Sequence, residues 1–239
     1  MNYAVIFAGG SGHRMRTNGL PKQFLKIEGI EIIIHTISLF ENHQDIDNIC
    51  VVCIEGWEEY LSELLKKYNI RKVKWIVKGG NSGQESIYNG LSALEQIDMD
   101  DIVLIHDGVR PFISNELISR CINSIKQTGS AISVTGAIET IITLDESNTQ
   151  VSNILNRASC FHAKAPQGFY LQNIMNVHNQ AKLDGRDDFI DSASLMKAYG
   201  YSLSIVECGP ENIKITTPSD YFIAKALFSE LESKQAFGV

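Results

Sequence analysis

Four short apolar segments alternate, along the first half of the chain, with segments that carry helical periodicity. The apolar runs are YAVIFA, NICVVCIE, VKWIVKGG and DIVLIHDGV, at residues 3–8, 48–55, 73–80 and 101–109. The helical segments cover residues 31–41, 57–68, 82–97 and 114–129. Strands that are apolar along their whole length are typical of parallel sheets covered by helices. The alternation therefore predicts an α/β fold with a Rossmann-like, mostly parallel sheet and helices on both faces.

Residues 131–160 show a different pattern, in which apolar and polar residues alternate around the turn sequence DESNTQ at 145–150. Alternation with a central turn predicts an antiparallel β-hairpin. A two-stranded hairpin is marginally stable alone, so this one needs a surface to pack on. The sequence leaves two alternatives for that surface. The hairpin is either a protruding arm used for dimerisation or a hairpin folded back on its own domain.

The remaining segments complete the expected domain. Helices are expected at 169–183 and 218–235, with a strand at 201–208 (YSLSIVEC) between them. The helix at 114–129 has Ser114 as its expected N-cap and Gly129 as its expected C-cap. No repeat, low-complexity tract or linker divides the chain, so we expect a single domain over residues 1–239 that contains the hairpin arm.

Charge and hydropathy exclude two classes of partner. The 239-residue chain has a formal net charge of −7, which argues against nucleic acid because phosphate backbones require clustered Lys and Arg. A small phosphorylated ligand in a local basic pocket remains compatible with this charge. No apolar run approaches the roughly 18 residues that span a bilayer, and no signal peptide is evident. We therefore expect a cytoplasmic protein with no membrane contact.

The five cysteines include a C-x-x-C pattern, Cys50 and Cys53, inside one of the apolar strands. Residues three apart on a strand point to opposite faces. No second pair of cysteines or histidines completes a tetrahedral zinc site. The pattern therefore predicts two buried thiols rather than a redox or zinc half-site.

The loop AGGSGHRM, at residues 8–15, follows the first strand directly. Small residues let backbone N–H groups approach phosphate oxygens closely. The loop does not match a Walker A sequence. It also fails the dinucleotide fingerprint, because Met15 stands where the third glycine should be and Pro21 disfavours a helix soon afterwards. The loop thus predicts a phosphate site of another kind, at the carboxyl end of the sheet, near residues 79–86 and Asp107.

Six blocks in order resemble a known family. They are AGGSGHRM…PKQFL, GGNSGQESIYNGL, HDGVRPF, NRASCFHAKAPQGF, DFIDSASLM and NIKITTPSD, and together they span nearly the whole chain. The chain resembles the cytidylyltransferases that activate polyol phosphates, which have a methylerythritol-phosphate branch and a ribitol-phosphate branch. The resemblance implies a Mg²⁺-dependent homodimer that transfers CMP from CTP to a polyol phosphate and releases pyrophosphate. A CDP-polyol of this kind would feed a surface polysaccharide or a teichoic-acid-like polymer, whereas the methylerythritol branch feeds isoprenoid synthesis.

The same resemblance assigns roles to residues on the nucleotide side. Arg14, Lys22 and Lys214 would be the catalytic cations, with the two lysines nearest the α-phosphate. Asp107 would hold Mg²⁺, although an aspartate before a glycine also commonly begins a turn. The residues that would bind CTP are Ala8, Gly9, Gly10, Ser11, Gly12, Gly80, Ser86, Asp107, Gly108 and Arg110. Without the resemblance, Ser86 would be taken as a helix residue, and Arg110 fits a structural ion pair about as well as a position near the base.

The acceptor side is expected to combine two subunits. Arg157 and Thr140, in the hairpin arm, match residues that reach a neighbouring subunit's substrate. Ala165 and Ile190 stand where the methylerythritol enzymes usually have threonines, and Gly83 stands where both branches usually have arginine. The loss of two hydroxyls favours another acceptor, such as ribitol or a different pentitol or hexitol phosphate. The more apolar wall would also suit the methyl-bearing substrate, so the acceptor remains open.

Two rival classes are also considered. A regulatory nucleotide-binding module would have no need of the full set of Arg14, Lys22, Asp107 and Lys214. A nicotinamide-dependent dehydrogenase is disfavoured by the failed dinucleotide fingerprint.

Overall fold

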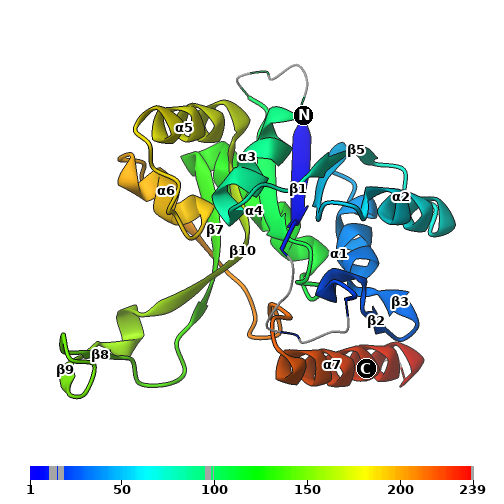
Figure 1. The fold of residues 1–239 in the computed structure, drawn as a ribbon. Helices are drawn as coiled ribbons and strands as arrows, with labels where there is room; N and C mark the ends of the chain where they lie inside the picture. The colour runs from blue at the N-terminus through cyan, green and yellow to red at the C-terminus, as the bar shows by residue number, and fades with distance from the viewer. Residues whose placement is uncertain (11–14, 16–18, 95–97, 99, 238–239) are drawn as a thin grey trace.

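A seven-stranded sheet forms the centre of the computed structural model, which describes residues 1–10, 15, 19–94, 98 and 100–237. The strand order is β11-β7-β10-β6-β1-β4-β5 (Figure 1). These strands are β1 (Asn2–Ala8), β4 (Asn48–Cys53), β5 (Val73–Lys78), β6 (Ile102–Asp107), β7 (Ser130–Gly136), β10 (Phe161–Tyr170) and β11 (Ile205–Glu207). All pairings in the sheet are parallel except those of β10, which runs antiparallel to both β6 and β7. The predicted mostly parallel, Rossmann-like sheet is confirmed.

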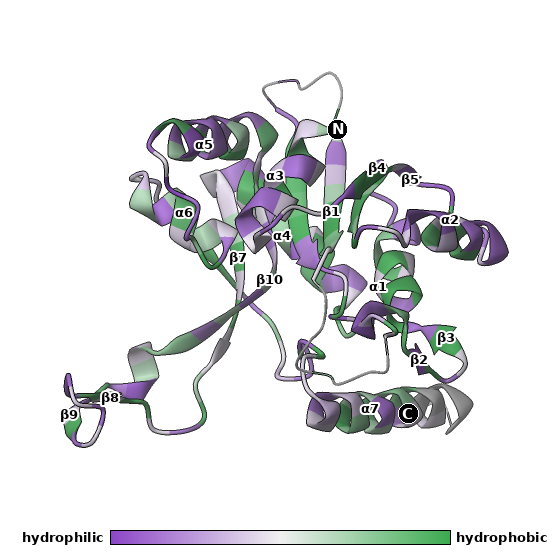
Figure 2. Cartoon of the chain, viewed as in Figure 1, coloured by the Kyte–Doolittle hydropathy of each residue, from purple (hydrophilic) through white to green (hydrophobic). Residues whose placement is uncertain are grey.

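Helices cover both faces of this sheet. They are α1 (Ile32–Glu41), α2 (Glu58–Lys67), α3 (Gly83–Ser92), α4 (Asn115–Thr128), α5 (Leu171–Leu183), α6 (Ser192–Ala198) and α7 (Pro218–Phe237). Because successive strand residues point to opposite faces, Ala4 and Ile6 of β1 join one core with α1, α2 and α4. Tyr3 and Val5 join the other core with α3, α5 and α6. Figure 2 shows the hydrophobic residues in the central strands and hydrophilic residues over much of α2 and α5.

The C-terminal helix α7 packs away from these two cores. It lies beside the short hairpin of β2 (Lys26–Ile27) and β3 (Ile30–Glu31). A third apolar cluster there includes Ala224 of α7, Ile27, Phe112 and Ile215. Through Ile215, this cluster holds residues 213–217 against the segment that follows β6. Lys214 lies in residues 213–217. None of the described helices has the length and apolar character needed for a membrane span.

The two cysteines of the C-x-x-C pattern are buried in β4 and point to opposite faces. Cys53 belongs to the core with α1, and Cys50 to the core with α3. Burial raises the pKa of each thiol to about 12. The interpretation of this pattern as two buried thiols is therefore confirmed.

The hairpin arm is shorter than predicted. Residues 131–136, expected in the arm, form most of β7 and lie inside the sheet. The alternating pattern predicted an exposed strand here because Ser133 is polar. Ser133 is nevertheless fully buried, and its hydroxyl donates to the carbonyl of Pro166 at 2.7 Å. The projecting part covers residues 137–160 and contains β8 (Ile142–Leu144) paired antiparallel with β9 (Val151–Ile154). Figure 1 shows this arm extending away from the sheet.

Two elements near the site were missed in the sequence. One is β10, whose last residues, Phe169 and Tyr170, pair with β6 and so shorten the helix predicted from residue 169. The other is α6, which begins at the capping box of Asp191 and Ser194. The predicted caps of α4 are confirmed. The Ser114 hydroxyl accepts from the Leu117 N–H at 3.1 Å, and Gly129 has a left-handed φ of 90°.

We expect Gly90→Ala to destabilise the fold, because α3 lies very close to the sheet at this residue. An added Cβ would lie 2.6 Å from Val52 Cγ2 and 2.7 Å from Val5 Cγ1, and overpacking of this kind costs about 1–3 kcal/mol. Chemical denaturation measures the loss. Gly83→Ala, on the same helix, is the control, because its added Cβ would meet nothing within 4 Å. Equal stability of the two variants would contradict this packing argument.

Candidate active site

Three loops meet at the carboxyl ends of β1, β5 and β6, and glycines allow their close approach. A Cβ on Gly9 would lie 3.2 Å from the Cα of Gly79 and 3.2 Å from the Ser86 hydroxyl. A Cβ on Gly108 would lie 2.9 Å from the Cβ of Ala8. These residues sit beside one another because the loops pack backbone against backbone. The structure thus brings together predicted nucleotide residues of all three loops, with Gly9 beside Ser86 and Gly108 beside Ala8.

Ser86, on α3, holds the second of these loops. Its buried hydroxyl accepts from the Gly80 N–H at 3.0 Å and donates to the Ser82 carbonyl at 2.8 Å. The proton of the hydroxyl is therefore used within the protein, and its oxygen retains one further lone pair. Ser86 and Gly80 act as a pair, and their role in reading a base stays a prediction.

A cluster of opposite charges lies at the end of β6. Asp107, with 5% of its surface exposed, forms an ion pair with Lys214. Its other oxygen accepts from Arg110 Nε at 2.7 Å. Burial by itself would raise the pKa of Asp107, but attraction by Lys214 and then by Arg110 lowers it below its ordinary value. The carboxylate is therefore ionised, and it holds two cations at the mouth of a cavity.

Lys22 lies against the segment that carries Lys214. It begins the short helix η2 (Lys22–Phe24), and its Nζ donates to the carbonyl of Ile215 at 3.1 Å. The next residue, Gln23, is buried and donates to the carbonyl of Ala8 at 2.6 Å. Gln23 thus ties the PKQ segment to the first loop, a role that its place in the sequence block did not reveal. The predicted residues Ser11, Gly12 and Arg14 lie outside the described residues.

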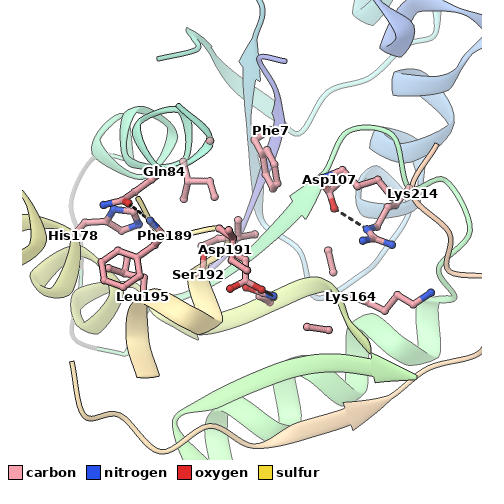
Figure 3. Close-up of a pocket in the computed structure, with 18 residues that line it drawn as sticks. Phe7, Gln84, Asp107, Lys164, His178, Phe189, Asp191, Ser192, Leu195 and Lys214 are labelled. Atoms are coloured by element: carbon pink, nitrogen blue, oxygen red, sulfur yellow. Dashed lines mark hydrogen bonds and ion pairs between the residues drawn. The ribbon is translucent and has the colours of Figure 1, made fainter. Parts of the chain in front are cut away.

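A cavity of about 230 Å³ opens beside this cluster. Figure 3 shows Asp107, Lys164 and Lys214 at one end of it and His178 and Phe189 at the other. Its lining residues are Phe7, Gly83, Gln84, Ile87, Ile105, Asp107, Arg110, Ala163, Lys164, Ala165, Gln167, His178, Phe189, Ile190, Asp191, Ser192, Leu195 and Lys214. The three positions at which the chain departs from the family pattern, Gly83, Ala165 and Ile190, all line it. Ala165 is a buried part of the wall, whereas Ile190 is 94% exposed.

Hydrogen bonds between β10 and α6 hold the floor of the cavity in place. Gln167 donates to Asp191 at 2.9 Å and accepts from the Ala193 N–H at 2.9 Å. Asp191 also caps α6 by accepting from the Ser194 N–H at 2.8 Å. None of these residues was predicted from the sequence. The spacing of Asp191 and Ser194, which resembles a capping box, is the signal that could have found them.

The two arm residues expected to contact the acceptor do not reach this cavity within one chain. Thr140 and Arg157 are both exposed. Arg157 lies in the short helix η3 (Arg157–Ser159), and its Nη1 donates to the carbonyl of Ile138 at 3.1 Å. It lines a separate shallow pocket at the base of the arm, with Gly136 and Phe161 among its neighbours. The structure therefore separates the arm residues from Lys214, Ala165 and Ile190.

Two histidines near the cavity are buried and neutral. Burial lowers the pKa of both His106 and His178 to about 4. The Nε2 of His106 bonds to the Arg110 carbonyl at 3.0 Å. The Nε2 of His178 has no hydrogen-bond partner. Within the described ranges, no cluster of three His, Cys, Asp or Glu side chains is arranged to hold a metal ion.

The sheet, the glycine-lined loops and the cationic cluster define the class as an α/β transferase that handles a phosphorylated nucleotide. The family described as "IspD: 2-C-methyl-D-erythritol 4-phosphate cytidylyltransferase" matches residues 2–230. The chain belongs to this family and is a CTP-dependent nucleotidyltransferase.

Relatives and solved structures agree with this assignment. The chain is 48% identical over 240 residues to a ribitol-5-phosphate cytidylyltransferase of Streptococcus agalactiae serotype III, with 100% of both chains covered. It is 36% identical to a 2-C-methyl-D-erythritol 4-phosphate cytidylyltransferase of Bacillus licheniformis, covering 95% of this chain and 96% of the relative. The crystal structure of 4-diphosphocytidyl-2C-methyl-D-erythritol synthase from Anaerococcus prevotii is similar, with a TM-score of 0.84 and 27% identity. That match covers 95% of this chain and 96% of the other.

Stability should fall as the pH drops from 6.5 towards 4, because His178 stays neutral in the folded chain while the unfolded chain takes up a proton. A pKa lowered from 6.5 to about 4 corresponds to at most ~3 kcal/mol of stability lost over this interval. We expect His178→Phe to lose less stability over the same interval, as measured by denaturation at several pH values. His162→Gln, at an exposed position, is the control and should follow the wild type. Parallel pH profiles for wild type and His178→Phe would contradict the assignment.

Proposed function

We propose that the chain transfers CMP from CTP to ribitol 5-phosphate or a closely related polyol phosphate, forming a CDP-polyol and pyrophosphate. The observation that carries this proposal is the cation cluster at the end of β6. There the ionised Asp107 holds Lys214, and Lys22 donates to the residue after Lys214. The 48% full-length identity to ribitol-5-phosphate cytidylyltransferases supports the acceptor. Residues 1–239 act as one catalytic unit, and the product serves as the activated donor for a surface polymer.

The reaction requires cations because both reactants are anions. A phosphate oxygen of the acceptor attacks the α-phosphorus of CTP, the bond from that phosphorus to the bridging oxygen breaks, and pyrophosphate leaves. Lys214 and Lys22 neutralise the charge that develops on the α-phosphate, with Arg14 on the triphosphate. The backbone of the first loop, from Ala8 to Gly12, holds the triphosphate. No covalent intermediate with the protein is needed, because positioning of the two reactants supplies much of the rate.

Asp107 fits a Mg²⁺ ion that arrives with the nucleotide. Mg²⁺ is commonly bound by one or two carboxylates together with substrate phosphates. Both oxygens of Asp107 are engaged by cations, but an ionised carboxylate offers about four acceptor positions in all. Asp107 would therefore hold the ion while remaining bound to Lys214 and Arg110. The ion would neutralise phosphate charge and orient the leaving pyrophosphate.

The base and the acceptor lie on opposite sides of this cluster in our proposal. The Ser86 and Gly80 pair binds the cytidine side, where a lone pair of the Ser86 hydroxyl is available to an amino group. Arg110, which shares the Asn212 carbonyl with Lys164, lies between the nucleotide and the acceptor. The acceptor lies along Ala165 and Ile190. These side chains offer no hydroxyl, so an acceptor held by other polar groups is favoured over methylerythritol phosphate. The free cysteines and the use of CTP are consistent with the cytoplasm as the compartment.

A panel of acceptors tests the proposal directly. We expect pyrophosphate release from CTP and Mg²⁺ with ribitol 5-phosphate, and a lower kcat/KM with methylerythritol phosphate and with hexitol phosphates. Replacement of CTP by ATP or UTP should reduce the rate strongly. Lys214→Ala is the control for contaminating activity and should be inactive. No turnover with any polyol phosphate would overturn the proposed function, and a preference for methylerythritol phosphate would overturn the choice of acceptor.

The arm supports a homodimer. It exposes several large apolar side chains, namely Ile138, Ile142, Leu144, Val151 and Ile154. A hairpin with apolar residues in solvent needs a surface to cover them, and a second copy of the chain would supply it. Thr140 and Arg157 do not line the cavity of their own chain. We therefore propose that each arm carries these two residues to the acceptor site of the partner subunit.

Subunit complementation tests the exchanged arm. Lys214→Ala and Arg157→Ala should each be nearly inactive as pure dimers. When both variants are co-expressed and pair randomly, about half of the dimers are mixed and one of their two sites is intact, so about a quarter of the wild-type activity returns. Activity per chain of the purified mixture, with all dimer types kept together, measures this. If each arm serves its own chain, the mixture stays as inactive as the two separate variants.

A further inference from the structure

We propose that Lys164 binds the phosphate of the acceptor. Lys164 lies near the middle of β10, and its side chain lines the cavity beside Asp107 and Lys214. In Figure 3 it extends along the same end of the cavity as these two residues. This inference rests on the proposed function and deepens it by assigning an acceptor-binding cation to the chain's own body rather than to the partner's arm.

Lys164 is held in place without a neutralising partner. Its Nζ donates to the Asn212 carbonyl at 3.0 Å, and that carbonyl also accepts from Arg110 Nη1 at 3.0 Å. Among the residues that the structure describes, no carboxylate forms an ion pair with Lys164. Glu211 attracts it only from a greater distance. An ammonium group has three protons to donate, so two remain for a ligand.

The surroundings of Lys164 favour an anion. Burial, and then the nearby positive charge of Arg110, lower the pKa of Lys164 below its ordinary value. Three cations, Arg110, Lys164 and Lys214, thus face this end of the cavity beside one carboxylate, although the chain as a whole has a net charge of −7. Cations crowded together and partly removed from water are destabilised in the free protein. An anionic ligand would relieve that repulsion.

Sheet order indicates which anion Lys164 faces. Strand β6, with Asp107 at its end, lies between β1 and β10. Ala8 to Gly10, the described start of the proposed triphosphate loop, follow β1 and so lie on one side of Asp107. Lys164 comes from β10, three residues before Gln167, which pairs with Ile105 of β6. It therefore lies on the opposite side of Asp107 from the triphosphate loop, where the attacking phosphate must lie for an in-line displacement.

Asn212 makes this placement rigid. It is buried, with 1% of its surface exposed, and its side-chain amide donates to the carbonyl of Ala165 at 2.7 Å. Its backbone carbonyl receives both Lys164 and Arg110. The segment that carries Lys214 is thereby fixed to the strand that carries Lys164. The two lysines thus approach the cavity from different elements that are joined through Asn212.

Steady-state kinetics of Lys164→Gln test the inference. We expect the KM for the polyol phosphate to rise roughly 10- to 100-fold, as for loss of a charge-assisted hydrogen bond, while the KM for CTP stays within about twofold. Lys164→Arg should recover most of the acceptor affinity, because it retains the charge. Lys197→Gln, an exposed lysine on α6, is the control and should match the wild type.

A binding measurement separates this inference from the proposed function, because it needs no turnover. Calorimetry with inorganic phosphate, at saturating CTP, should show weaker binding to Lys164→Gln than to the wild type. Ribitol without a phosphate should bind both proteins equally. An unchanged phosphate affinity would overturn the inference even if the enzyme is active. An equal rise in the KM for CTP, or a loss of folding stability that accounts for the whole effect, would also overturn it.

Discussion

The ion pair between Asp107 and Lys214 is the interaction on which the rest of the site depends. Removing the Asp107 carboxylate from water is costly, and attraction by Lys214, whose side chain stays 39% exposed, offsets that cost only where geometry and further hydrogen bonds are good. The fold supplies those conditions from three directions. Strand β6 ends at Asp107, Arg110 turns back to bind its second oxygen, and the third apolar cluster holds the segment of Lys214 beneath them. A buried carboxylate that depends on a partly exposed lysine contributes little to the stability of a fold, and Lys214 keeps enough exposed surface at the mouth of the cavity to meet a ligand.

The central strands and the ends of one helix could be predicted from the sequence, because they depend on local patterns of residues. Apolar runs gave the central strands, and Ser114 and Gly129 gave the ends of a helix. The remaining errors have physical causes. Ser133 has the polarity of a surface residue, but inside the sheet its hydroxyl donates to the carbonyl of Pro166. The arm therefore begins later in the chain than the polar pattern predicts. Lys164 and Asn212 could not be identified from the sequence, because their roles depend on a contact between residues that are 48 positions apart. No periodicity or local motif records such contacts.

The charge of the whole chain makes the local cluster more informative. With a net charge of −7, the protein as a whole repels phosphorylated substrates. An anion approaching the carboxyl edge of the sheet meets Lys22, Lys214, Arg110 and Lys164 within a small region, and low-dielectric walls strengthen their field. Outside this region the acidic surface disfavours nonspecific binding of phosphates. The same contrast explains why the net charge argued against nucleic acid and yet left a small phosphorylated ligand open.

The proposed nucleotide side and acceptor side of the site differ in construction, and this difference would let the acceptor change while the nucleotide stays the same. The nucleotide side depends on backbone groups and on glycines packed so closely that Gly108 and Gly9 leave little room for side chains. A substitution there disturbs three loops at once. The proposed acceptor side depends instead on single side chains, namely Ala165, Ile190 and Lys164. Ile190 is almost fully exposed, so its replacement has little effect on the core. Selection for a new polyol can therefore act on the acceptor wall one residue at a time, whereas selection for a new nucleotide would have to rebuild the junction of β1, β5 and β6.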